Sequence, residues 1–185
     1  FSIAHIGTMV KTRNPVKLWK VLRKLKELDS SFASQLEIKI VGSIDYSVRQ
    51  SIEENQLTAM VSFINYVDHD VVIRYQKESQ VLLLVLNDSK NARGILTGKF
   101  FEYMASGRPI LCIGPEDGDA AAIIKETGVG EVCDFNDEEK MSRIILQWFA
   151  EFKEGRLMAH SHDIERYSRG ALTKQLVTLL DRISK

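Results

Sequence analysis

The hydrophobic residues of this chain gather in short runs that alternate with longer stretches of mixed character. Six runs of four to seven residues have the apolar composition of buried parallel strands, and they lie at residues 2–7, 36–42, 60–64, 80–86, 109–113 and 131–134. In the stretches between them, apolar residues recur at the spacing of amphipathic helices. This alternation predicts an α/β protein with a doubly wound, mostly parallel six-stranded sheet.

The stretches between the runs, and the one after the last run, predict the helices. The first helix opens with Pro15, which the first turn of a helix tolerates, and its apolar stripe extends from Leu18 to Leu28. Further helices are predicted up to about residue 55, at 70–79, 98–106 and 120–127, and at about 138–154. A terminal helix at about 164–183 follows from the spacing of its leucines.

Residues 94–115 carry the candidate chemistry of the chain. Thr97 has a hydroxyl suited to an N-cap, and it directly precedes the helix predicted at 98–106. Free N–H groups at a helix start, with the positive end of the helix dipole behind them, favour a bound phosphate. Gly98 has no side chain to keep an anion away, and Lys99 adds a positive charge. The pattern therefore predicts a phosphate site at this helix start.

Glu102 lies one turn further along the same helix, three residues after Lys99 and on the same face. A carboxylate repels phosphate, but it accepts hydrogen bonds from two neighbouring hydroxyls. Phosphate donors beside a diol acceptor suggest the ribose and diphosphate of a nucleotide. The residues alone leave a second interpretation open, in which Lys99 and Glu102 form an ordinary surface pair on an amphipathic helix.

Length, composition and charge limit the other possibilities. A chain of 185 residues with 44% hydrophobic residues can build one substantial core, and its formal charge of zero gives no indication of nucleic-acid binding. The charge is uneven, since seven basic residues and no acidic one fall between positions 11 and 26. Most of the lysines on the first helix are expected to be solvated. Lys11 and Arg13, in contrast, follow the first strand, at the end where open α/β sheets bind ligands.

Cysteines, histidines and apolar runs indicate the setting of the protein. Cys112 and Cys133 lie in apolar runs and are expected to be reduced core thiols. His160 and His162 have no partner at metal-site spacing, so no metal site is predicted. The longest apolar run is too short to cross a bilayer and no secretory signal is present, so a cytoplasmic protein is expected. The first strand begins without an initiator Met, which suggests a fragment of a longer protein.

Residues 97–130 resemble a known family. A Lys-x-x-Glu-Tyr segment at Lys99–Tyr103, followed by Ser-Gly-x-Pro-Ile, is similar to the nucleotide-sugar-binding half of family 4 glycosyltransferases with the GT-B fold. The likeness is strongest to the branch that makes bacterial surface polysaccharides. It implies that residues 1–185 form a single nucleotide-sugar-binding domain, a Rossmann-like half of a GT-B fold. An N-terminal acceptor domain of the same polypeptide would then be absent from this chain.

The resemblance also implies roles for individual residues. The nucleotide and its diphosphate would be bound by Gly7, Thr8, Lys11, Arg13, Tyr66, Val67, Thr97, Gly98, Lys99 and Glu102. In this set Glu102 holds the ribose hydroxyls, and Tyr66 and Val67 contact the base. The donor sugar would lie near Gly94, Glu116 and Asp117. Many members of the family have a glutamate at the position of Gly94, so this chain departs from the pattern in the part that touches the donor sugar.

The function implied is transfer of a sugar from a nucleotide diphosphate sugar to an acceptor glycan or lipid-linked glycan, without a cofactor. The catalytic general base would lie outside this chain, and the missing domain could attach the protein peripherally to the inner face of the membrane. Two alternatives stay open, namely a non-catalytic domain that binds a nucleotide or partner and a sugar-nucleotide epimerase. The base, sugar, acceptor, linkage, stereochemical outcome and oligomeric state are not specified by the sequence.

Overall fold

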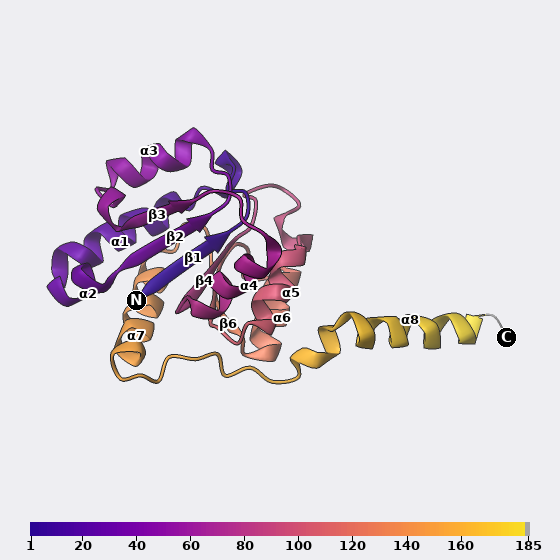
Figure 1. Ribbon diagram of the computed structural model, residues 1–185. Coiled ribbons are helices and arrows are strands. Elements are labelled where there is room, and N and C mark those ends of the chain that lie inside the picture. The colour runs from indigo at the N-terminus through magenta and orange to yellow at the C-terminus, as the bar shows by residue number, and fades with distance from the viewer. Residues whose placement is uncertain (184–185) are drawn as a thin grey trace.

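The computed structural model describes residues 1–183, which form a Rossmann-like α/β domain built on one sheet (Figure 1). All strand pairs are parallel, and the strand order is β3-β2-β1-β4-β5-β6. The strands are β1 (Ser2–Ile6), β2 (Glu37–Val41), β3 (Val61–Ile64), β4 (Val81–Val85), β5 (Ile110–Ile113) and β6 (Gly130–Cys133). The predicted doubly wound, six-stranded parallel sheet is therefore confirmed.

Eight α-helices and four short 3₁₀ segments connect and extend the strands in the described part of the chain. The helices are α1 (Val16–Leu28), α2 (Ser30–Gln35), α3 (Tyr46–Glu54), α4 (His69–Glu78), α5 (Gly98–Ala105), α6 (Asp119–Thr127), α7 (Glu138–Lys153) and α8 (Arg169–Ile183). The 3₁₀ segments are η1 (Lys11–Arg13), η2 (Thr58–Met60), η3 (Ala92–Gly94) and η4 (Ile164–Tyr167). The pattern did not predict α2, which Asp29 caps by accepting from the N–H groups of Ser31 and Phe32. The terminal helix predicted at 164–183 is divided into η4 and α8.

Two hydrophobic layers cover the two faces of the sheet. Helices α1, α2, α3 and α7 bury their apolar sides on one face, and α4, α5 and α6 cover the other (Figure 1). The central strand β4 is buried along its whole length and sends alternate side chains to the two layers. Cys112 and Cys133 are buried free thiols in opposite layers, as expected of core cysteines.

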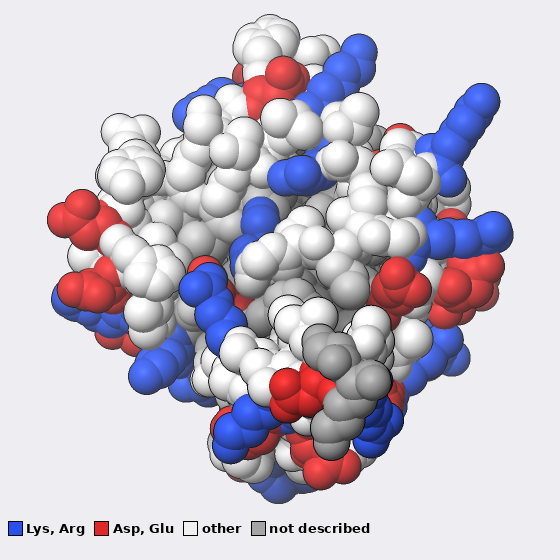
Figure 2. All heavy atoms as spheres, turned by 90° about the vertical axis from the view of Figure 1, so that its right-hand side faces the viewer, with Lys and Arg blue, Asp and Glu red and all other residues white. Residues whose placement is uncertain are grey.

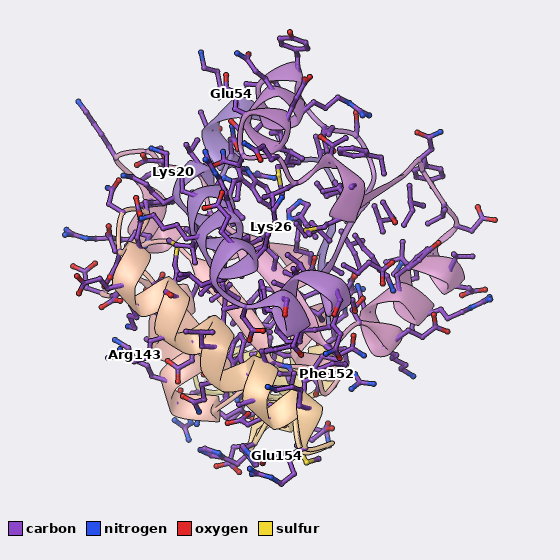
Figure 3. All side chains as sticks on the ribbon, turned by 90° about the vertical axis from the view of Figure 1, so that its left-hand side faces the viewer. Lys20, Lys26, Glu54, Arg143, Phe152 and Glu154 are labelled. Atoms are coloured by element: carbon purple, nitrogen blue, oxygen red, sulfur yellow. The ribbon has the colours of Figure 1, made fainter. Side chains whose placement is uncertain are left out.

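Helix α1 is tied to α7 by charge as well as by packing. Lys17 and Lys24 both bond the carboxylate of Glu138, with Nζ–O distances of 3.0 and 2.8 Å. Figure 3 shows α7 lying across this side of the molecule beside α1, which carries the labelled Lys20 and Lys26. Lys17 and Lys24 are both accessible to solvent, and each is in addition paired with Glu138. The helical pattern showed their polar face but gave no sign that the N-terminus of α7 would meet it.

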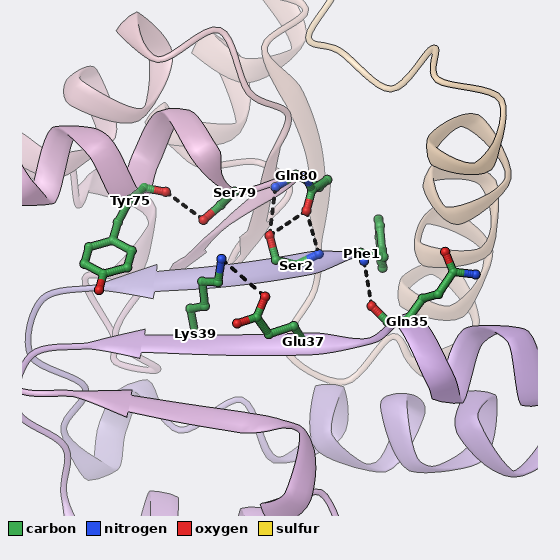
Figure 4. A network of polar contacts seen from close by, with 8 residues as sticks. All are labelled: Phe1, Ser2, Gln35, Glu37, Lys39, Tyr75, Ser79 and Gln80. Atoms are coloured by element: carbon green, nitrogen blue, oxygen red, sulfur yellow. Dashed lines mark hydrogen bonds and ion pairs between the residues drawn. The ribbon is translucent and has the colours of Figure 1, made fainter.

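The amino ends of the two central strands are joined by side-chain hydrogen bonds (Figure 4). Gln80 Oε1 accepts from the backbone N–H and the hydroxyl of Ser2 at 2.9 and 2.6 Å, and the N–H of Gln80 donates to Ser2 Oγ at 3.1 Å. These bonds support the register in which Ile3 lies opposite Val81. They lie at the edge of the sheet opposite to the carboxyl ends of the strands.

Helix α8 extends away from the sheet (Figure 1). Its apolar side chains are largely exposed, from 45% for Leu172 to 72% for Ile183. Among the described residues, no helix has both the length and the hydrophobicity needed to cross a membrane.

Candidate functional site

The carboxyl end of β1 meets the first turn of α5 at a partly buried cation, the ammonium of Lys99. A Cβ atom added to Gly7 would lie 2.9 Å from Nζ of Lys99, so the missing side chain of Gly7 leaves the space that the ammonium occupies. Gly7 also has a φ of +111°, which residues with a side chain rarely adopt. Figure 2 shows this side of the molecule hollowed at its centre, with Lys or Arg atoms inside the hollow.

Helix α5 is fixed in its rotation by Tyr103. The Tyr103 hydroxyl accepts a hydrogen bond of 2.9 Å from the backbone N–H of Ile6, at the end of β1. The ring is fully buried together with Phe100, and burial raises the pKa of the phenol. Tyr103 directly follows Glu102, so this anchor determines where the neighbouring carboxylate lies. Tyr103 was not among the predicted site residues.

The first turn of α5 has no side-chain cap. Thr97 occupies the N-cap position, but its side chain makes no capping hydrogen bond, and its buried Oγ1 has no hydrogen-bond partner among the described residues. The expectation that its hydroxyl caps the helix is therefore wrong, because the hydroxyl is turned into the protein. A Cβ on Gly98 would meet no other described part of the protein within 4 Å, so the space beside Gly98 is open. Uncapped amides facing open space suit an anion.

The charge of Lys99 is poorly compensated in the protein. Burial, and after it the Arg13 guanidinium, lowers the pKa of Lys99 from 10.5 to about 8, while the Glu102 carboxylate acts in the opposite direction. Two cations near each other, one of them largely buried, are stabilised when an anion binds between or beside them. The electrostatics of this pair therefore favour a phosphate ligand.

Arg13 is positioned for this role and Lys11 is not. Arg13 Nε donates to Asn87 Oδ1 at 2.6 Å, and its terminal nitrogen lies 3.5 Å from the carbonyl oxygen of Thr8. Lys11 is exposed, and the charge it acts on is that of Asp45. Asn87 was not predicted as a site residue, although a polar residue directly after a buried strand is a signal that could have identified it.

Glu102 presents an exposed carboxylate beside the phosphate candidates. The Lys99 ammonium is close enough for Glu102 to affect its pKa. Gln76 Nε2, from α4, donates to Glu102 Oε2 at 3.3 Å. The predicted juxtaposition of Lys99 and Glu102 on one face of the helix is confirmed.

His5 lies behind the site in β1 and was not singled out by the sequence. Its Nδ1 lies 3.1 Å from the carbonyl oxygen of Leu83, which only accepts, so Nδ1 carries the hydrogen. Burial, and after it the Lys99 ammonium, lowers the pKa of His5 from 6.5 to about 3. Between about pH 3 and pH 8 the imidazole is therefore neutral while Lys99 is charged, and it does not add to the positive charge near a ligand.

This neutral histidine predicts a specific loss of stability in acid. Between pH 6.5 and about 3 the unfolded chain binds a proton at His5 that the folded chain does not, so the free energy of unfolding falls as the pH falls. One such proton contributes a slope of up to about 1.4 kcal/mol per pH unit. Urea unfolding at several pH values should show a shallower slope for His5→Asn, which keeps an amide donor for Leu83. Equal slopes for the two chains would contradict a buried neutral imidazole.

Two of the donor-sugar candidates, Glu116 and Asp117, line a separate cleft at the carboxyl ends of β4, β5 and β6, whereas Gly94 is not part of its lining. The cleft has a volume of about 810 Å³. Two of its carboxylates already have cationic partners, since Glu116 bonds Lys140 at 2.6 Å and Asp117 bonds Arg93 at 3.0 Å. Gly94 belongs to η3, and a Cβ there would have no atom within 4 Å. The space at Gly94 is therefore open rather than filled by another residue.

The base candidates follow β3 and differ in their surroundings. Tyr66 is 89% exposed, whereas Val67 is partly buried and packs against the hydrophobic layer of α4, α5 and α6. Of these two side chains, the ring of Tyr66 has the larger exposed surface for contact with a ligand. In the part of the chain that the structure describes, no group of three or more His, Cys, Asp or Glu side chains is arranged to hold a metal ion.

Sequence comparison identifies one family. Residues 1–168 match the family described as Glycosyl transferases group 1. Among curated proteins, none is similar enough in sequence to count as a match.

Several solved structures have the same fold. An α,α-trehalose-phosphate synthase (UDP-forming) from Burkholderia vietnamiensis is similar over 100% of this chain and 45% of its own, with a TM-score of 0.70 and 12% identity. The C-terminal domain of a group 1 glycosyl transferase (LpcC) from Francisella tularensis is similar over 91% of this chain and 85% of its own, with a TM-score of 0.66 and 13% identity. WaaG, a glycosyltransferase involved in lipopolysaccharide biosynthesis, is similar over 89% of this chain and 44% of its own, with a TM-score of 0.62 and 18% identity. The chain thus spans less than half of the synthase, and these likenesses show the fold alone.

Proposed function

Because the chain belongs to the group 1 glycosyltransferases, we propose that it is the donor-binding domain of an enzyme that transfers a sugar from a nucleotide diphosphate sugar to an acceptor. The observation that carries this proposal is the Lys99 ammonium, held over Gly7 beside the uncapped first turn of α5. A diphosphate placed there would satisfy both the amides and the cation.

The chemistry of this part of the enzyme is stabilisation of the leaving group. When the bond between the sugar and the diphosphate breaks, negative charge grows on the diphosphate oxygens. The amides of Gly98 and Lys99, together with the Lys99 ammonium and the Arg13 guanidinium, would face that charge. Positively charged groups that are already positioned stabilise a developing anion without reorganisation. Asn87 supports this arrangement because it holds Arg13 in place.

The rest of the donor would extend in two directions from the diphosphate. Glu102 would accept hydrogen bonds from the ribose hydroxyls, and the exposed ring of Tyr66 with the backbone at Val67 would meet the base. On the other side, the sugar would enter the cleft lined by Glu116 and Asp117, near Gly94. The backbone at Gly7 and Thr8 would border the diphosphate.

The remaining parts of the reaction would belong to a second, N-terminal domain of the same polypeptide. That domain would bind an acceptor glycan or lipid-linked glycan and supply the general base. Its presence is supported by length, since the chain spans 45% of the trehalose-phosphate synthase that it resembles in fold. Synthesis of a surface polysaccharide fits the likeness in fold to WaaG, a glycosyltransferase involved in lipopolysaccharide biosynthesis. The proposed enzyme would be cytoplasmic and attached peripherally to the inner face of the membrane through the N-terminal domain.

A second candidate function is a domain that binds a nucleotide without catalysing transfer. The open space at Gly94 favours it, because the resemblance that identifies the diphosphate site has a sugar-binding glutamate at this position. Such a domain would bind a nucleoside diphosphate and its sugar conjugate equally well. A transferase domain would bind the sugar conjugate of its own donor more tightly.

Thermal stabilisation by a panel of ligands tests the proposal. At about a hundred times its dissociation constant, a ligand adds roughly 2.7 kcal/mol to the stability of the protein that binds it. We expect stabilisation by at least one of UDP, CDP, ADP, GDP and TDP, and loss of it in Gly98→Val, whose branched side chain would occupy the open space beside Gly98. Gly170→Val is the matched control, since Gly170 also lies in the first turn of a helix with open space around it. Stabilisation by no nucleotide, or equal stabilisation of both variants, would contradict the proposed site.

A further inference from the structure

Gln76 is a buried amide that reaches the candidate ribose carboxylate. It lies in α4 and is 3% exposed, while the neighbouring Val72 and Tyr75 pack into the hydrophobic layer. An amide in such surroundings costs free energy unless it is hydrogen-bonded. Its Nε2 donates to Glu102 Oε2 at 3.3 Å, so the polar end of a buried side chain on α4 meets an exposed carboxylate on α5.

The bond restrains a carboxylate that would otherwise be free to move. An exposed glutamate on a helix samples several rotamers, and ordering it when a ligand binds costs conformational entropy. A hydrogen bond from a rigid, buried partner orders the carboxylate in the free protein, so less conformational entropy is lost when the ligand binds. It occupies only one of the several acceptor positions of the carboxylate, which leaves the others for hydroxyl groups.

The neutral charge of the donor also matters. Glu116, at the donor-sugar cleft, is bonded by the ammonium of Lys140 at 2.6 Å, so its charge is compensated within the protein. The Gln76 amide carries no charge, and the charge of Glu102 is thus left available to strengthen hydrogen bonds from a ligand. The contact orients the carboxylate without neutralising it.

We propose that Gln76 is a positioning residue for ribose recognition, which holds the Glu102 carboxylate toward the 2′- and 3′-hydroxyls of the nucleotide. This inference rests on the proposed function. The contact between α4 and α5 would then help to select ribonucleotides over 2′-deoxyribonucleotides, in addition to holding the two helices together.

The test compares the affinities of Gln76→Met and of the unmodified chain for UDP, CDP, ADP and GDP, each beside its 2′-deoxy counterpart, and for TDP. Methionine keeps the length and volume of the side chain and removes the donor. We expect the affinity for the ribonucleotide to fall by roughly three- to tenfold, and that for the 2′-deoxy counterpart to fall less, so that their ratio moves toward one. In Glu102→Gln the further change Gln76→Met should leave the ratio unaltered, because the two residues act as a unit.

Gln80→Met is the matched control. It removes the two hydrogen bonds that Gln80 Oε1 accepts from Ser2 at the opposite edge of the sheet, so it should lower the melting temperature and leave the ratio unchanged. If Gln76→Met lowered the affinity for a ribonucleotide and for its 2′-deoxy counterpart equally, Gln76 would have a structural role only, and the inference would be overturned. The inference would also be overturned if TDP, which lacks the 2′-hydroxyl, bound most tightly, or if the unmodified chain showed no preference for ribonucleotides. Failure of that chain to bind any of these nucleotides would remove the proposed function, and the inference with it.

Discussion

Lys99→Met should lose most of the affinity for nucleoside diphosphates and make the unliganded protein more stable at neutral pH. Charge-assisted hydrogen bonds contribute about 1.5–3 kcal/mol, which corresponds to roughly ten- to a hundredfold in affinity. Binding of the free nucleoside should hardly change, because the ammonium faces the phosphates. Calorimetric titration with the diphosphate and with the nucleoside gives both values, and Lys20→Met, at an exposed position on α1, is the control.

The gain in stability follows from the burial of the ammonium. The pKa of Lys99 is about 8 in the folded chain and 10.5 in the reference state, so between these pH values the unfolded chain binds more protons. The free energy of unfolding should therefore rise from pH 8 to 10.5 in the unmodified chain, and the full cost of the buried charge is present below pH 8. Lys99→Met lacks both the cost and this rise. A variant with unaltered diphosphate affinity would show that the cation does not face the ligand.

Glu102→Gln should weaken binding of ribonucleoside diphosphates by roughly ten- to a hundredfold, because the charge-assisted hydrogen bonds to the ribose become neutral ones. The side chain is exposed, so urea unfolding should give nearly the same free energy for variant and unmodified chain. Glu53→Gln, at another exposed helical position, is the control. Unchanged affinity in the folded variant would remove Glu102 from the site.

The same substitution should alter the pH dependence of binding. The Glu102 carboxylate raises the pKa of Lys99, so its removal lowers that pKa further below 8. Diphosphate affinity, which falls as Lys99 loses its proton, should then begin to fall at a lower pH in Glu102→Gln than in the unmodified chain. Titrations between pH 6.5 and 9 would show the shift. An identical pH profile would mean that the two charges do not interact.

Local patterns in the sequence are sufficient for the strands of this protein and for most of its helices. The period of the apolar residues indicates whether a segment is covered on one side or on both, and this gives six strands, their alternation with helices and a parallel sheet. The helix at α5 and its end at Gly107, which has a φ of +73°, are local in the same sense. So is the placement of Lys99 and Glu102 on one face, since residues three apart on a helix are neighbours.

The assembled site depends on contacts between residues far apart in the chain, and no local pattern specifies these. The space that Gly7 leaves for Lys99 exists because β1 ends where α5 begins. Asn87 and Gln76 orient Arg13 and Glu102 from other elements, so the choice of Arg13 over Lys11 could not be made from spacing. The burial of the Thr97 hydroxyl likewise depends on packing between elements, so no local pattern predicted it. A side chain's partner is determined by packing between elements, whereas periodicity reports only which side of an element is apolar.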